Sequence, residues 1–138
     1  MRLEDKVALI TGAASGIGKE TAILFAQEGA KIVAVDLNVS DGEKTMSEVK
    51  SAGGDAIYVN ADVSKSADCE KMVIAAEENY GKLNVLFNNA GIEGRIMSLI
   101  EYPEDDFDQV INVNLRGVWL GMKNAAPAMF ANGGGSII

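Results

Sequence analysis

The sequence predicts an α/β fold, a doubly wound parallel sheet whose fifth strand has only begun when the chain ends. Short, nearly continuous apolar runs recur along the chain, as expected for strands that are buried on both faces. Segments with helical spacing separate these runs, and connections this short imply right-handed crossovers within one domain, residues 1–138. The expected strands are residues 7–11, 32–36, 56–60, 85–88 and 136–138.

Four helices are expected between these strands. The first, residues 16–27, should turn Ile17, Ala22, Leu24 and Phe25 to its apolar side and stop at Gly29. The second should begin at Ser40, where Ser40 and Glu43 have the form of a capping box, and end at Gly53 and Gly54. The third should start near Ser64 or Ser66 and end before Gly81.

The fourth expected helix is the longest, from about residue 104 to residue 129. Its apolar residues include Phe107, Val110, Ile111, Trp119 and Met122. We expect Trp119 in the core, although this helix could also contribute to an interface between copies of the protein.

Composition excludes several classes of function. The chain has 20 acidic and 12 basic residues, a net charge of −8, which argues against nucleic acid and against anionic membrane surfaces as partners. No apolar run suits a membrane span or a signal peptide, so we expect a cytoplasmic protein. The absence of histidine removes histidine-based triads and the commonest zinc sites, and we expect no metal site. The single cysteine, Cys69, lies between two acids and is expected to be an ordinary helix residue.

Glycine or short polar residues follow each of the first four expected strands. In a parallel sheet the carboxyl ends of the strands share one edge, and doubly wound folds bind ligands there. Four such loops on one edge are better support for a site than any single motif. The loops contain residues 11–18, Asp36, Asp62 with Val63, and residues 88–91.

The first of these loops has glycines at 12, 16 and 18, a spacing that predicts a pyrophosphate site of the Rossmann-like kind. Gly12 suits a tight exit from the strand, and Gly16 and Gly18 allow close approach of phosphate and close packing of the helix. The start of the following helix offers free N–H groups to an anion. An ordinary glycine-containing turn is the alternative. A Walker-type phosphate loop fails, because Ala13 and Glu20 stand where Gly and Ser or Thr are needed.

Asp36 lies 18 residues beyond Gly18, near the spacing of an acid that binds the ribose hydroxyls of a dinucleotide. Its charge would repel a 2′-phosphate, and neither Ser15 nor Leu37 supplies the basic side chain that NADP needs, so NAD is the expected cofactor. A turn aspartate at the strand end is the alternative. Asp62 could accept from the adenine amino group, or could be a turn residue before the third helix.

Together these residues resemble the short-chain dehydrogenase/reductase family. The resemblance covers the chain from Leu3 to Ile138 and rests on four motifs in family-like order: Thr11-Gly12-x-x-x-Gly16-x-Gly18, Asp62-Val63, Asn88-Asn89-Ala90-Gly91 and Asn112-Val113-Asn114-Leu115-Arg116-Gly117. It implies that the Asn-Asn-Ala-Gly turn braces the sheet and borders the cofactor. It also implies that Asn114 interrupts its helix and holds a water in a proton relay, as the catalytic residue present here. For Asn112, simple surface exposure is the alternative.

The sequence departs from the family at its end. Members continue the fifth strand into a catalytic serine, a Tyr-x-x-x-Lys helix and two more strands. Tyr58, Tyr80 and Tyr102 lie elsewhere and none has lysine four residues later. We therefore expect an NAD-binding Rossmann-like domain, incomplete at its C-terminus, the front part of a reductase.

The resemblance implies an NAD-dependent enzyme that oxidises a secondary alcohol or reduces a ketone, and a homo-oligomer. Two alternatives are a non-catalytic NAD-binding fragment and a truncated chain that needs a partner chain to fold. The residues expected to bind the cofactor are Gly12, Ser15, Gly16, Ile17, Gly18, Asp36, Leu37, Asp62, Val63, Asn89, Ala90 and Gly91.

Overall fold

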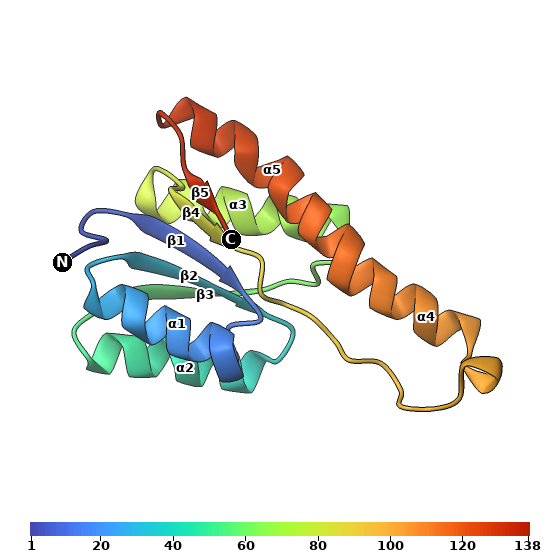
Figure 1. Ribbon diagram of the computed structural model, residues 1–138. Helices are drawn as coiled ribbons and strands as arrows, with labels where there is room; N and C mark the ends of the chain where they lie inside the picture. The colour runs from blue at the N-terminus through green and yellow to red at the C-terminus, as the bar shows by residue number, and fades with distance from the viewer.

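A computed structural model describes all residues from Met1 to Ile138 and contains one parallel sheet of five strands (Figure 1). The strand order is β3-β2-β1-β4-β5, so the direction of winding reverses between β1 and β4. Each strand begins and ends within one residue of its expected position, which confirms the fold class. The strands are β1 (Val7–Thr11), β2 (Lys31–Asp36), β3 (Asp55–Asn60), β4 (Val85–Phe87) and β5 (Ser136–Ile137).

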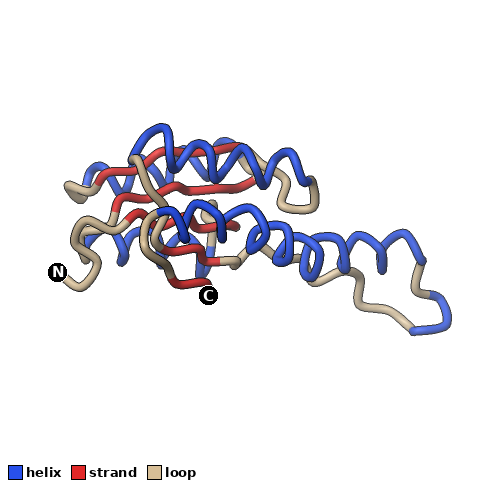
Figure 2. Tube along the Cα trace, turned by 90° about the horizontal axis from the view of Figure 1, so that it is seen from above, coloured by secondary structure: helices blue, strands red, loops and turns tan.

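Helices cover both faces of the sheet, as Figures 1 and 2 show. On one face lie α1 (Gly16–Gln27) and α2 (Val39–Ser51), and on the other lie α3 (Ser66–Tyr80) and α5 (Gly117–Ala131). The helix α4 (Glu104–Ile111) continues through a π-helical segment, Asn112–Arg116, into α5. This long helical rod reaches out beyond the carboxyl edge of the sheet. A loop with a short 3-10 helix (Leu99–Glu101) returns the chain from β4 to α4.

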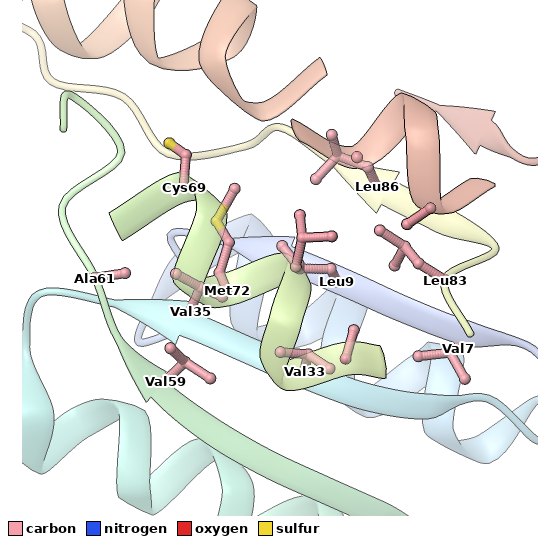
Figure 3. Packing of buried hydrophobic residues seen from close by; sticks show 14 of the residues in the cluster. Val7, Leu9, Val33, Val35, Val59, Ala61, Cys69, Met72, Leu83 and Leu86 are labelled. Carbon is pink, nitrogen blue, oxygen red and sulfur yellow. The ribbon is translucent and has the colours of Figure 1, made fainter. Parts of the chain in front are cut away.

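The sheet separates two hydrophobic clusters, because successive side chains of a strand point to opposite faces. In β1, Val7 and Leu9 belong to the cluster under α3 and α5, and Ala8 and Ile10 to the cluster under α1 and α2. Figure 3 shows the first cluster, with Met72 of α3 close to the strand residues. Full burial of one such aliphatic side chain contributes about 1.5–3 kcal/mol to the stability of the fold. Because both faces of the strands are buried, the strands appear in the sequence as continuous apolar runs.

The expected apolar side of α1 is partly wrong. Ile17 and Leu24 are 72% and 48% exposed, whereas Ala22 is fully buried and Phe25 packs against the second cluster. The first turn of α1 lies at the rim of the sheet, beside the glycine loop. Ile17 therefore has no strand beneath it.

The expected N-terminus of α2 at Ser40 is also wrong. The helix begins at Val39 and its cap is Asn38, not Ser40, because the Asn38 side-chain oxygen accepts from the Asp41 N–H at 3.1 Å. Asp36 in turn accepts from the Asn38 N–H at 3.0 Å. The turn that ends β2 thus leads directly into the helix, two residues earlier than the capping box suggested.

Trp119 is not in the core, contrary to the sequence-based expectation, and is 52% exposed. The buried side of α5 consists of Leu120, Met129 and small residues such as Gly121 and Ala125. Trp119 faces outward, with the Lys123 ammonium 5.1 Å from its ring centroid.

Cys69 is an ordinary helix residue, as expected. It is buried in α3 and its thiol donates to the Val63 carbonyl at 3.2 Å. Burial, with the nearby Asp68 charge, raises the pKa of Cys69 to about 11. None of the helices is both long enough and apolar enough to cross a bilayer.

Candidate functional site

A cleft of about 690 Å³ lies at the carboxyl edge of the sheet, where the strand ends meet the glycine loop and α4. It brings together the residues expected to bind cofactor, all but Gly18. The lining that the sequence predicted consists of Gly12, Ser15, Gly16, Ile17, Asp36, Leu37, Asp62, Val63, Asn89, Ala90 and Gly91. Doubly wound sheets bind ligands at this edge, beside the reversal of strand order.

The glycine loop packs tightly against the end of β4. Gly12 has φ +67°, and a Cβ there would lie 2.9 Å from the Asn89 amide nitrogen. Gly16 also has a positive φ, +52°, but faces open space. A Cβ on Gly18 would overlap the carbonyl oxygen of Gly12. Gly18 is therefore buried beneath the loop, and it shapes the cleft without lining it.

The start of α1 opens onto this cleft. Ser15 is the N-cap residue by backbone position, yet its side chain makes no capping bond. The first N–H groups of a helix lack acceptors within the helix and attract anions. This end of α1 is suited to a pyrophosphate.

Thr11 connects β1 to the turn after β4. Its hydroxyl donates to the Phe87 carbonyl at 3.3 Å and accepts from the N–H groups of Asn89 and Ala90, each at 3.0 Å. The Asn89 amide donates back to the carbonyls of Thr11 and Gly12, at 3.0 and 3.3 Å. The Asn-Asn-Ala-Gly turn therefore braces the central strands. Sequence reasoning did not single out the role of Thr11, although a hydroxyl that ends a buried strand requires partners.

The carboxylate of Asp36 lies between the glycine loop and the turn into α2. Its Oδ2 accepts from the Ala14 N–H at 2.9 Å and its Oδ1 from the Asn38 N–H at 3.0 Å. An ionised carboxylate has about four acceptor positions, so about two remain for ribose hydroxyls. Leu37, the next residue, is exposed at the rim.

Asp62 lies in the turn before α3. Its Oδ1 accepts from the Ser64 N–H at 3.0 Å and the Ser64 hydroxyl at 2.7 Å, and these bonds, with the Lys65 charge, hold the pKa of Asp62 below its usual range. These contacts are the ones expected if Asp62 is a turn residue before α3, the alternative given by the sequence. Its Oδ2, 3.6 Å from the Lys65 ammonium, is the oxygen left for an adenine amino group.

Asn114 does not line the cleft. It lies in the π-helical segment, so the expected interruption of the helix is observed. Its Oδ1 accepts from the Ile92 N–H and its Nδ2 donates to the Ile92 carbonyl, both at 2.8 Å. This pair of hydrogen bonds fixes the loop segment that follows Gly91 to the π-helical segment. Asn112 is exposed and borders the cleft.

Several lining residues come from α4 and its extension. Asn112 and Val113 belong to a motif quoted above but were not assigned to the cofactor, and Asp105, Asp108 and Gln109 were not predicted at all. Nothing local signals their role, because the loop between β4 and α4 decides where α4 lies. The Arg95 guanidinium forms an ion pair with Asp106 at 2.6 Å, and the backbone N–H of Arg95 donates to the Tyr102 hydroxyl at 3.1 Å.

The charged side chains that line the cleft all have one sign, although the Lys65 ammonium lies close by, paired with Asp62. The charged lining residues of the cleft are carboxylates, and neither lysine nor arginine lines it. The nearby Lys19 is paired with Glu48 at 2.8 Å. No cationic side chain therefore lines the cleft to pair with a 2′-phosphate.

Comparisons of sequence show what the chain is similar to. The family model described as short chain dehydrogenase matches residues 6–138. Cyclohexanol dehydrogenase of Acinetobacter sp. is 41% identical over 137 residues, which are 99% of this chain and 55% of that protein. The mitochondrial borneol dehydrogenase of Lavandula x intermedia is 47% identical over 138 residues, 99% of this chain and 51% of that protein. The chain spans about half the length of the curated relatives it matches.

Solved structures agree with this likeness. Levodione reductase superimposes with a TM-score of 0.94 at 38% identity, over 99% of this chain and 54% of that chain. NAD+-bound xylitol dehydrogenase does so with a TM-score of 0.95 at 33% identity, over 99% of this chain and 53% of that chain.

Proposed function

The chain belongs to the short-chain dehydrogenase family, and on this premise we propose that it provides the NAD site of an oxidoreductase that acts on a secondary alcohol or a ketone. The observation that carries the proposal is Asp36, placed beside the glycine loop in a cleft without cationic side chains. Relatives described as cyclohexanol and borneol dehydrogenases support the alcohol or ketone, and the NAD+-bound xylitol dehydrogenase supports the cofactor.

The residues of the cleft suit the parts of a dinucleotide. The glycine loop and the start of α1 would hold the pyrophosphate, Asp36 the adenosine ribose, and Asp62 and Val63 the adenine. The turn at Asn89–Gly91 would border the cofactor farther along the edge. NAD, when bound, supplies the acceptor for a hydride.

A second candidate function applies to the 138-residue chain by itself: nucleotide binding without catalysis. The observation that favours it is the set of contacts of the tyrosines. None of the three lines the cleft, and each hydroxyl is hydrogen-bonded elsewhere.

We predict that the protein binds NAD more tightly than NADP, and that Asp36→Ala narrows the difference. Loss of hydrogen bonds to a charged acceptor costs about 1.5–3 kcal/mol, so NAD affinity should fall by roughly ten- to a hundredfold. NADP should bind no worse, because the repulsion of its phosphate is removed. Calorimetric titration with both cofactors measures this.

The matched control for this titration is Asp55→Ala. Asp55 begins β3 at the opposite edge of the sheet, where it accepts from the Tyr80 hydroxyl at 3.0 Å, so its removal should leave both affinities unchanged. Wild-type protein that binds NADP as tightly as NAD, or more tightly, would refute the role of Asp36.

We also propose that the protein forms a homo-oligomer through α4 and α5. Exposed apolar side chains follow one another along this rod at intervals of three to four residues or multiples of these: Phe107, Ile111, Leu115, Trp119, Met122 and Phe130. Residues at this spacing share one face of a helix, and a contiguous apolar face of this kind marks an interaction surface.

Sedimentation tests this proposal. Trp119→Glu should shift the protein toward the monomer, because it places an unpaired charge in the contact. Ile74→Glu, at an exposed apolar residue of α3, is the control and should not. Wild-type protein that sediments as a monomer at micromolar concentration would count against the oligomer.

A further inference from the structure

The backbone that carries Asp36 is bound from the neighbouring edge strand. The Asp36 carbonyl accepts from the Tyr58 hydroxyl at 2.7 Å, the Asn60 amide at 3.2 Å and the Ala61 N–H at 3.3 Å. The Asn60 amide also donates to the Leu37 carbonyl at 3.0 Å. The carbonyls of Asp36 and Leu37 therefore accept four hydrogen bonds in all. Regular strand pairing would supply only the one from Ala61.

The two side chains reach this place for different reasons. Asn60 is the direct partner of Asp36 in the register of β2 and β3, strands that lie side by side at the end of the sheet (Figure 1). Tyr58 pairs with Ala34, two residues earlier, and its hydroxyl reaches along the sheet to Asp36. Its ring lies against Gly42 of α2, where a Cβ would overlap the ring. The glycine thus leaves room for this tyrosine.

The carboxylate of Asp36 is held on its other side by the N–H groups of Ala14 and Asn38. Backbone and side chain of one residue are thus fixed by bonds to the glycine loop, to the turn before α2 and to β3. A carboxylate discriminates against a 2′-phosphate only if it cannot swing away from it, because the repulsion of two anions falls as they separate.

We infer that Tyr58 and Asn60 are positioning residues for Asp36, and that they sharpen the preference for NAD over NADP. The inference rests on the proposed function, since it concerns the same cofactor. Tyr58 and Asn60 do not line the cleft, so they act through Asp36 and not by contact with the nucleotide.

Calorimetric titration of Tyr58→Phe and Asn60→Ala with NAD and with NADP tests the inference. We expect the ratio of NAD affinity to NADP affinity to fall by about three- to tenfold, the effect of losing one or two ordinary hydrogen bonds. The control is Tyr80→Phe, which removes a tyrosine hydroxyl bonded to Asp55 of the same strand and should leave the ratio unchanged. Equal losses of affinity for both cofactors would mean general destabilisation and would overturn the inference.

A double-mutant cycle shows whether the effect runs through Asp36. In an Asp36→Ala background, Tyr58→Phe should leave the ratio of affinities unchanged, because no carboxylate remains to be positioned. A narrowing equal to that in the wild-type background would overturn the inference.

Amide hydrogen exchange without any cofactor separates this inference from the proposed function. We expect the Ala14 and Asn38 amides to exchange about three- to tenfold faster in Tyr58→Phe than in Tyr80→Phe, because their acceptor is then less firmly held. A wild-type chain that binds neither cofactor would contradict the proposed function and the preference. The exchange rates would still test whether Tyr58 positions Asp36. Equal rates in Tyr58→Phe and Tyr80→Phe would overturn that role.

Discussion

The 138-residue chain is expected to show no measurable hydride transfer, with NAD and secondary alcohols or with NADH and ketones. The ionisable side chains that line the cleft are aspartates, with no tyrosine, lysine or cysteine among them, and a positioned general acid or base of matched pKa contributes roughly 10²–10⁴-fold in rate. Reactants that are not aligned lose further orders of magnitude, because effective molarity depends on geometry.

The tyrosines cannot act as this general acid or base. The Tyr58 hydroxyl donates to the Asp36 carbonyl, and none of the three tyrosines has a lysine four residues later to stabilise a phenoxide. Burial and the Asp55 carboxylate raise the pKa of Tyr80 above its ordinary value. Asn114 is no substitute, because its amide is paired with the Ile92 backbone and amides do not transfer protons near neutral pH.

NADH absorbance measured with a panel of alcohols and ketones tests this expectation, on protein whose mass confirms 138 residues. Asn114→Ala serves as the diagnostic variant. Turnover that survives purification and disappears in Asn114→Ala would contradict the expectation and would reveal an unrecognised acid or base within the chain.

Gly18→Ala is expected to weaken cofactor binding by more than tenfold and to destabilise the fold. Helix propensity alone would favour alanine by about 0.5–1 kcal/mol. Its Cβ would however overlap the Gly12 carbonyl and lie 2.6 Å from the Asn89 amide nitrogen. Overpacking costs about 1–3 kcal/mol, and more where backbone is the obstacle. Since α1 or the glycine loop must move, the site that we propose for the pyrophosphate should move with it.

Gly53→Ala is the control for this change. Gly53 has φ +84° in a turn far from the cleft, with no atom near the position of a Cβ. It should lose about 1 kcal/mol of stability from backbone strain and keep its cofactor affinity. Chemical unfolding and titration with NAD measure both effects. If Gly18→Ala behaved like Gly53→Ala in both measurements, the tight packing beneath the loop would not matter for the site.

The sheet and the edge at which the cleft lies could be predicted from the sequence because they depend on local signals. Strands buried on both faces show as apolar runs, and β1 is buried along its whole length. The glycines at 12 and 16 mark positive φ values, and the polar residues after each strand must share one edge in a parallel sheet.

The helix faces were harder to predict, because periodicity gives the spacing of apolar residues but not the neighbour that they meet. Ile17 lies over the rim of the sheet and Trp119 on the outer side of α5. The lining from α4 depends on bonds between distant residues, such as those between Ile92 and Asn114. The ties from Tyr58 and Asn60 to Asp36 likewise appear only once β2 and β3 are paired in register.

We propose that the carboxyl edge of this sheet binds NAD, and a nuclear magnetic resonance titration of the isotope-labelled chain with NAD can locate the binding site residue by residue. We expect the largest changes in amide chemical shift in the glycine loop at residues 12–18, at Asp36 and Leu37, at Asp62 and Val63, and at Asn89–Gly91. The amides of α3 between residues 70 and 80, on the face of the sheet away from the loop, should not change. No shift at saturating NAD, or shifts centred on residues outside the cleft, would show that this edge does not bind NAD.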